Sequence, residues 1–410
     1  MATPLLVPLR EPRFRALVTG RTFADFANAV APFALAFAVL DLTGSAVDLG
    51  IVVGARSIAN VLLVLFGGML ADRLPRSVIL QGTETAAALT QAAIAVSVLG
   101  GFASVPLLVG LSLVNGAVSA ISLPAAASLT PLTVPARLLT PANALVRLLS
   151  NTGRIAGAGL AGVLVAFAGS GWALAGNAVL FLAAAVSYHR IRLPRGERIP
   201  GRRPLGELAE GWREFSSRPW VWLVVLQFMV VNAVTAGALR VLGPLVADDT
   251  FGRTGWGLAL AGQTAGSLLG GVIAAHWQPR RMLLIGVALV TVDALPMLVL
   301  GETPYLLPLL FAMFLTGIAI EQFAVAWDVS LQEHIPPEKL ARVYSYDMLG
   351  SFVAMPLGQI AAGPLAEHAG REATLLGGAA LVIGATVLVA SHPQVRRLVR
   401  REPVSPGAPG

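Results

Sequence analysis

Twelve apolar stretches dominate this sequence of 410 residues, and each is long enough to cross a lipid bilayer. A membrane-spanning helix needs about 20 mostly apolar residues. The stretches lie at 17–41, 46–70, 78–100, 104–129, 141–168, 171–189, 219–246, 255–276, 281–300, 304–331, 341–367 and 372–391. We therefore expect an all-α integral membrane protein with twelve transmembrane helices.

The composition argues against most other classes of protein. Hydrophobic residues make up 56% of the chain and charged residues only 12%, whereas soluble domains carry about 25% charged residues. The chain has no cysteine, which excludes disulfides, thiolate metal sites and a cysteine nucleophile. Its single lysine, Lys339, does not belong to a phosphate-binding Gly-Lys-Ser/Thr loop. We expect no metal, no cofactor and no enzymatic activity.

Basic residues are distributed unevenly among the predicted loops. If the N-terminus faces the cytoplasm, the inner segments hold nearly all of the basic loop residues, and the outer segments hold only Arg253 and Arg371. This bias predicts that both termini are cytoplasmic. The net charge of +7 is then explained by basic groups that face the anionic lipid of the inner leaflet. Nucleic acid is not an expected partner.

A glycine-rich sequence with a polar break occurs twice, at 67–80 and at 270–284. Both copies read Gly-Gly, the end of a helix, a break that contains Pro-Arg, and a new apolar run. Because the copies lie about half a chain apart, we expect two pseudo-symmetric six-helix bundles. The predicted organisation is a cytoplasmic tail at 1–16, a bundle at 17–189, a cytoplasmic linker at 190–218 with an amphipathic helix over 205–215, a second bundle at 219–391 and a tail at 392–410.

The first copy of this repeat carries a recognisable pattern. It contains Gly68, Leu70, Ala71, Asp72, Arg73, Arg76 and Leu80. These residues match the pattern Gly-x-Leu-Ala-Asp-Arg-x-Gly-Arg-Lys-x-x-Leu of the major facilitator superfamily, which the chain resembles over nearly its whole length. Pro75 and Ser77 depart from the pattern, in place of its second glycine and of its lysine. The resemblance implies two six-helix bundles that rock around a central site.

Shorter stretches narrow the resemblance to the bacterial branch that includes macrolide and enterobactin exporters. They lie at 42–45, 134–135, 142–145, 327–328, 334–337 and 342–343. This branch implies efflux driven by the proton gradient across the bacterial plasma membrane, and we expect a monomer. One departure weakens the antiporter signature of the superfamily: in the segment 157–162, Ala158 stands where that signature has proline.

The first span carries charged and polar residues on one face. Arg21, Asp25 and Asn28 are spaced four and three residues apart, and therefore share one side of a helix. A charge within the bilayer costs at least about 2.5–3.5 kcal/mol, so each needs a reason. Two interpretations remain open. Arg21 and Asp25 either neutralise each other near the inner end of the helix or form a proton or substrate site that the pairing tunes.

The tenth span carries Glu321 and Asp328 two helical turns apart on one face. A carboxylate in a low-dielectric site can hold and release a proton near neutral pH, as a proton-coupled carrier requires. Asp25, Glu321 and Asp328 are therefore the candidate proton-coupling residues. The alternative for Glu321 is an ion pair with an arginine of another helix. The intramembrane arginines that could act as charge partners are Arg21, Arg56, Arg147, Arg154 and Arg240.

The superfamily resemblance also implies cavity and gating residues. It places the first, fourth, seventh and tenth spans around the cavity, where the candidate substrate-contacting residues are Asn28, Asn115, Ser119, Ser122, Gln227, Asn232 and Thr235. The candidate gating residues are Gly68, Asp72, Arg73 and Arg76. A carboxylate at position 72 can bond the N-terminus of a neighbouring helix and so stabilise the state closed to the cytoplasm.

These observations favour a secondary active transporter. We expect proton-coupled efflux of a small apolar or amphiphilic compound, such as a drug, antibiotic or siderophore, by alternating access. The expected partners are that small molecule, protons and membrane lipid. The alternatives are a proton-coupled importer of a small nutrient and a non-transporting membrane sensor. A sugar importer would need more hydrogen-bonding side chains in its cavity than the spans offer, and a sensor would need a folded soluble domain.

Overall fold

The computed structural model describes residues 6–71, 76–127, 129–191, 212–213, 215–277 and 279–399. All regular secondary structure within these ranges is helical. The first part of the chain forms η1 (Val7–Arg10), α1 (Pro12–Thr43), α2 (Ala46–Ala71), α3 (Arg76–Leu99), α4 (Val105–Ala127), η2 (Thr130–Leu132), η3 (Ala136–Leu138), α5 (Leu139–Ala168) and α6 (Ser170–His189). Most of the predicted linker, including most of its amphipathic helix at 205–215, lies outside the described residues.

Several spans in the second part of the chain are built from two or three consecutive elements. The elements are α8 (Pro219–Gly237), η4 (Ala238–Leu242), α9 (Gly243–Asp249), α10 (Gly252–His276), α11 (Met282–Leu289), η5 (Val290–Asp293), α12 (Ala294–Glu302), α13 (Leu306–His334), α14 (Pro337–Phe352), α15 (Met355–Ala369), α16 (Arg371–Ser391) and α17 (Pro393–Arg397). The element η4 is a turn of π-helix between α8 and α9. Such breaks are tolerated within a membrane where neighbouring helices satisfy the freed backbone groups.

Each of the twelve predicted spans coincides with a helix or with a run of consecutive helices. Among the described residues, eleven segments are long and apolar enough to cross a membrane. The remaining predicted span forms α3, whose apolar sequence is interrupted by Gln81, Glu84 and Gln91. The prediction of an all-α multi-pass membrane fold is confirmed.

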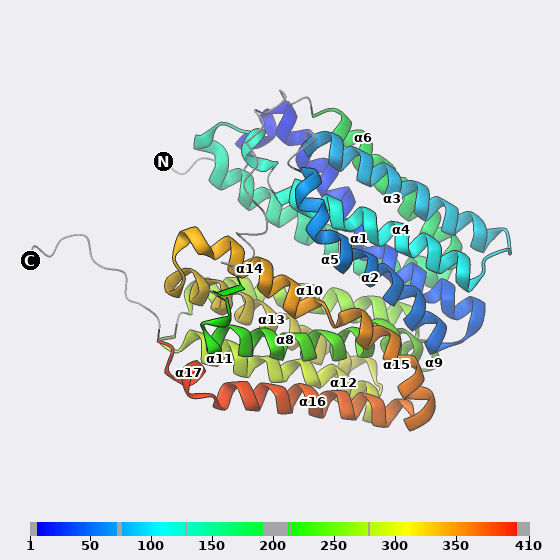
Figure 1. Cartoon of the computed structure of the whole chain (residues 1–410). Helices are drawn as coiled ribbons and strands as arrows, with labels where there is room; N and C mark the ends of the chain where they lie inside the picture. Colours follow the sequence, from blue (N-terminus) through cyan, green and yellow to red (C-terminus); the bar gives the residue numbers. More distant parts are fainter. Residues whose placement is uncertain are drawn as a thin grey trace, which may run out of the picture.

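The helices pack into two groups that follow the order of the chain (Figure 1). In the N-terminal group, α1 packs against α5 and α6, and α2 packs against α4. In the C-terminal group, α10 packs against α13, and α8 packs against α15 and α16. Two ends can be distinguished. Helix α1 begins and α16 finishes at one end, where α17 lies at the left of Figure 1, and we call this the terminal end. Helix α9 lies at the other end, which we call the opposite end.

The two groups touch each other through α2 against α15 and α5 against α10. Glycines bring the backbones together near the opposite end. A Cβ atom added to Gly363 of α15 would lie 2.5 Å from the Cα of Val47 in α2. A Cβ atom added to Gly50 of α2 would lie 2.5 Å from the carbonyl oxygen of Gln359. Small residues are what permit such close approach of helices in a membrane.

The glycine-rich segment of α5 makes the second contact between the groups. A Cβ atom on Gly162 would lie 2.7 Å from the carbonyl oxygen of Arg253 in α10. One turn and a half earlier, a Cβ atom on Gly157 would lie 2.7 Å from the carbonyl oxygen of Phe26 in α1. The segment therefore supports close packing on two sides, although Ala158 stands where the antiporter signature has proline.

Candidate substrate and proton site

Asp25 lies between two arginines in the N-terminal group. Its Oδ2 is 3.9 Å from Nε of Arg21, one turn earlier in α1, and its Oδ1 is 3.7 Å from Nε of Arg154 in α5. Asp25 Oδ2 is buried and accepts no hydrogen bond from the described residues. The pairing of Arg21 with Asp25 that helical spacing allows is present, and α5 adds a second cation.

Glu321 lies on α13 of the C-terminal group and is half-buried. The Cβ of its side chain packs on Gly270 of α10, where an added Cβ atom would be only 2.9 Å away. The positive charges of Arg147 and Arg154, both on α5 of the other group, act on Glu321. Arg154 therefore forms an ion pair with Asp25 in its own group, and its charge also acts at longer range on Glu321 of the other group.

The charged residues nearer the terminal end are accessible although they lie well inside their helices. Arg147, Arg154 and Asp328 are exposed, as is Asn28. At 1.5 Å per residue, Arg147 and Asp328 lie about 30 Å from the ends of α5 and α13 at the opposite end of the molecule. The close backbone contacts between the groups at Gly50, Gly162 and Gly363 lie within about 10 Å of that opposite end.

A carboxylate that the sequence analysis did not single out belongs to the same region. Asp347 of α14 accepts hydrogen bonds from Trp327 Nε1 at 2.8 Å and from Ser351 Oγ at 3.1 Å. Asp328 accepts a hydrogen bond from the Tyr344 hydroxyl at 2.8 Å. Asp347 could have been found from the sequence, because it lies within the predicted span 341–367 and a charge there is costly.

Several predicted cavity residues are already engaged with the protein. Asn115 is buried and donates to Thr90 Oγ1 at 3.1 Å, and Gln227 is buried and donates to Thr386 Oγ1 at 3.0 Å. Asn232 Nδ2 donates to the carbonyl oxygen of Ser351 at 2.9 Å. These three side chains connect helices within their own groups.

Three further predicted cavity residues bond to their own helices. Asn28 Nδ2 donates to the carbonyl oxygen of Ala24 at 2.9 Å, and Ser122 Oγ donates to that of Ser119 at 3.0 Å. Thr235 Oγ1 donates to the carbonyl oxygen of Val231. Because the Ser122 and Thr235 hydroxyls act as donors in these bonds, their oxygen lone pairs remain available to another donor.

An ion-pair cluster joins the two groups at the opposite end. Arg253 at the start of α10 donates to Asp41 Oδ1 of α1 at 2.5 Å and to Asp248 Oδ1 at 2.7 Å. Its guanidinium lies over the ring of Phe37, 4.7 Å from the centroid. Ser170 Oγ of α6 donates to the other oxygen of Asp41 at 2.8 Å. The sequence analysis counted Arg253 only as an outer loop charge.

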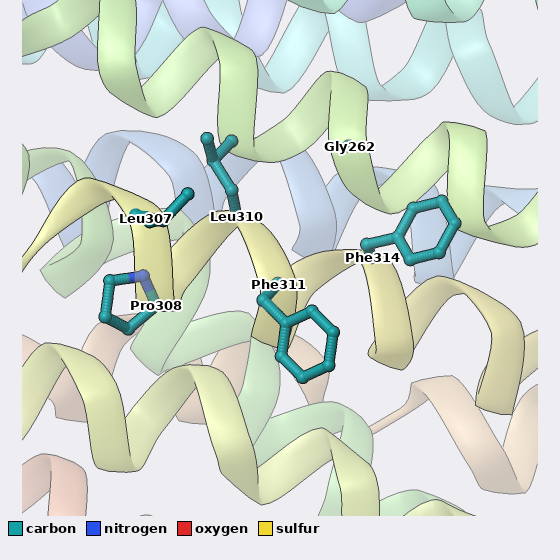
Figure 2. Close-up of a pocket in the computed structure, with 6 residues that line it drawn as sticks. All are labelled: Gly262, Leu307, Pro308, Leu310, Phe311 and Phe314. Atoms are coloured by element: carbon teal, nitrogen blue, oxygen red, sulfur yellow. The ribbon is translucent and has the colours of Figure 1, made fainter.

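An apolar groove in the described part of the molecule lies away from these charges. It has a volume of about 640 Å³ between α10 and α13, and Figure 2 shows its lining by Gly262, Leu307, Pro308, Leu310, Phe311 and Phe314. Leu307 and Phe311 are strongly exposed. Because it is entirely apolar and faces outward on a spanning helix pair, this groove fits lipid chains, and the polar residues between the groups are the better candidate site.

Comparison with known proteins decides the family. The sequence-family model described as Major Facilitator Superfamily matches residues 17–358 and 241–406 of this chain. The chain belongs to the Major Facilitator Superfamily. The resemblance inferred from the pattern at 68–80 is thereby confirmed.

Curated relatives in the superfamily are efflux proteins. The multidrug efflux pump Tap of Mycolicibacterium fortuitum is 27% identical, and the match covers 96% of this chain and 97% of Tap. Macrolide efflux protein A of Streptococcus pyogenes is 23% identical, with 94% of this chain and 97% of the relative covered. These matches agree with the branch that the sequence motifs indicated.

Solved structures of the superfamily share the fold. The nucleoside transporter NupG superposes with a TM-score of 0.73 at 13% identity, covering 94% of this chain and 99% of that chain. A bacterial homologue of the lysosomal transporter Spinster, in an inward-facing and unoccupied conformation, gives a TM-score of 0.69 at 17% identity, covering 97% and 98%. At these identities the likeness shows the fold alone.

The superfamily motif itself falls at the border of the described structure. Helix α2 ends at Ala71 and α3 begins at Arg76. Asp72 and Arg73 lie outside the described residues, and so do the surroundings of Gly68 and the side chain of Arg76. Their role in gating stays a prediction.

Proposed function

We propose that this protein exports a small apolar or amphiphilic compound across the bacterial plasma membrane in exchange for protons, by alternating access. Arg154 carries the proposal: it lies 3.7 Å from Asp25 of one helix group, and its charge acts on Glu321 of the other. A cation whose charge acts on carboxylates of both groups links the protonation of these carboxylates to the distance between the groups. The efflux relatives support the export direction.

The orientation of the chain gives the two ends their roles. Both termini lie in the cytoplasm, as the bias of basic loop residues predicts. The terminal end is then cytoplasmic, and the contacts of α2 with α15 and of α5 with α10 close the outer end. The conformation is inward-facing, with Arg154 and Asp328 accessible from the cytoplasm. Asp72 and Arg76 act as the latch of the opposite conformation, in which the cytoplasmic end is closed.

The signs of the charges give a direction to proton exchange. When Glu321 is ionised, it attracts Arg147 and Arg154 across the interface, which favours closure of the cytoplasmic end and opening of the outer end. When Glu321 takes a proton from the acidic outer side, this attraction is lost and the inward-facing conformation returns. Release of that proton to the less acidic cytoplasm resets the cycle. The protons move inward as the compound moves outward.

The substrate class follows from the few polar groups that remain available. Asn115, Gln227 and Asn232 are hydrogen-bonded within the protein. A sugar or similar nutrient would leave most of its hydroxyl groups without partners, at a cost of about 1–3 kcal/mol for each buried group. An apolar or amphiphilic compound avoids this cost. The protein acts as a monomer with protons, lipid and this compound as its partners.

Transport in inverted membrane vesicles tests the proposal. With the lumen made acidic, vesicles that contain the protein should accumulate at least one compound from a panel of a macrolide, a tetracycline and ethidium. Nigericin, which dissipates the pH gradient, should abolish the accumulation. If the same gradient drives a compound out of the lumen, the protein is an importer. If no compound moves under either direction of the gradient, the proposed function is wrong.

A further inference from the structure

Two arginines from different helix groups lie at the same depth in the molecule. Arg56 is ten residues from the start of α2, and Arg240 is nine residues from the end of α9. At 1.5 Å per residue both lie about 15 Å from the end where the groups meet, near the middle of a bilayer. The substrate sites of secondary transporters typically lie near the midplane of the bilayer.

The packing of α15 brings these two positions toward each other. Gly54, half a turn before Arg56, packs on the side chain of Ile360 in α15, where an added Cβ atom would be 2.6 Å away. Gly237, just before the turn that carries Arg240, packs on the carbonyl oxygen of Gly358, at 2.6 Å for an added Cβ atom. Helix α2 also contacts η4 directly. The charge of Arg240 correspondingly acts on Arg56.

Arg56 is held in place by a chain of hydrogen bonds. Its Nε donates to Asn115 Oδ1 at 3.0 Å, and Asn115 in turn donates to Thr90 Oγ1 at 3.1 Å. Asn115 is buried and Arg56 is only partly exposed. This chain uses one of the five N–H groups of the guanidinium and leaves its two terminal nitrogens available to a ligand.

Arg240 is presented differently, on a widened helical turn. It lies within the π-helix Ala238–Leu242 and is exposed, while Leu239 and Val241 beside it are buried. Turns of π-helix occur frequently at functional sites. Among the residues that the structure describes, no carboxylate forms an ion pair with either Arg56 or Arg240.

Two uncompensated cations at this depth are costly to the protein alone. A single charge in the middle of a bilayer already costs several kcal/mol, and a second like charge nearby adds repulsion. An oxyanion between the two guanidinium groups would compensate their charges and replace their mutual repulsion with attraction to the anion. Arginine binds carboxylates and phosphates through paired N–H groups.

We propose that Arg56 and Arg240 form an anion-binding subsite that spans the two helix groups and receives a carboxylate or another oxyanion of an amphiphilic compound. It rests on the proposed function in one respect: the anion belongs to the transported compound. Since the two arginines come from different groups, a bound anion stabilises the conformation in which they face each other. By reciprocity, closure of this end increases the affinity for the anion.

Equilibrium binding without any gradient tests the subsite separately from transport. The full chain in phosphatidylcholine nanodiscs is titrated with 2-naphthoate and with its neutral analogue 2-naphthamide. We expect 2-naphthoate to bind at least tenfold more tightly than 2-naphthamide. Arg56→Gln and Arg240→Gln should each remove this preference, and Arg240→Lys should retain part of it. Arg396→Gln, at an exposed arginine of α17, should bind as the wild type does. Thermal unfolding shows that each variant is folded.

A cross-link reports whether the bound anion joins the groups. In a Gly159→Cys/Ala261→Cys protein, 2-naphthoate should accelerate disulfide formation between α5 and α10, and Arg56→Gln or Arg240→Gln should abolish that acceleration. Equal affinity for acid and amide, or a preference that survives in both glutamine variants, would overturn the proposal even if vesicles transport other compounds. Competition by phosphatidylglycerol in the nanodisc would assign the site to a lipid headgroup and also overturn it.

Discussion

Replacing Gly363 with valine is expected to lower transport more than tenfold while leaving the protein folded. The added Cβ atom would lie 2.5 Å from the Cα and 2.6 Å from the backbone nitrogen of Val47. Neither backbone atom can move without shifting the whole of α2. The clash exists only while α15 and α2 are in contact, so the substitution removes one conformation of the cycle rather than the fold.

The matched control is Gly377→Val. Gly377 lies on the neighbouring helix α16, and a Cβ atom added there meets nothing within 4 Å. Both variants should unfold at temperatures close to that of the wild type, and only Gly363→Val should lose uptake into inverted vesicles. Equal transport by the two variants would show that contact between α2 and α15 is not part of the cycle.

Glu321→Gln and Asp25→Asn are expected to lower accumulation driven by the pH gradient at least tenfold. Glutamine at 321 imitates the protonated acid permanently, so the attraction to Arg147 and Arg154 can no longer respond to the proton. Asparagine at 25 leaves Arg154 without the carboxylate 3.7 Å away. Asp328→Asn should have a smaller effect, because Asp328 is exposed and hydrogen-bonded to Tyr344.

Exchange of labelled for unlabelled compound, measured without a gradient, separates coupling from binding. Glu321→Gln should retain exchange within about threefold of the wild type, since substrate can still cross when no proton is needed. The control is Glu372→Gln at the exposed start of α16. If Glu321→Gln, Asp25→Asn and Asp328→Asn all keep gradient-driven accumulation, the assignment of the coupling residues is wrong.

The helices could be predicted from sequence because a lipid solvent imposes length and apolarity on each span. The predicted spans 46–70 and 171–189 agree with α2 at Ala46–Ala71 and α6 at Ser170–His189 within one residue at each end. Helical spacing alone also placed Arg21 beside Asp25. In each case the relevant interactions are local along the chain or with the solvent.

Partners from different helices could not be predicted in the same way. The ion pair of Asp41 with Arg253 joins α1 to α10, and no local pattern relates these residues. The superfamily resemblance assigned Asn115 and Gln227 to the cavity, but it did not predict the helices that those side chains contact. Arg56 and Arg240 were candidate partners for intramembrane carboxylates, whereas in the described structure Arg56 donates to Asn115 and its helix α2 contacts η4, which carries Arg240.

The most direct test of alternating access uses the absence of cysteine from the natural chain. A Cβ atom on Gly159 of α5 would lie 3.7 Å from the Cβ of Ala261 in α10, close to the separation of about 3.8 Å found in disulfides. We predict that oxidation of a Gly159→Cys/Ala261→Cys protein abolishes pH-driven uptake, that dithiothreitol restores it, and that neither single cysteine variant responds. Undiminished uptake by the fully cross-linked protein would contradict the claim that these helix groups separate to export the compound.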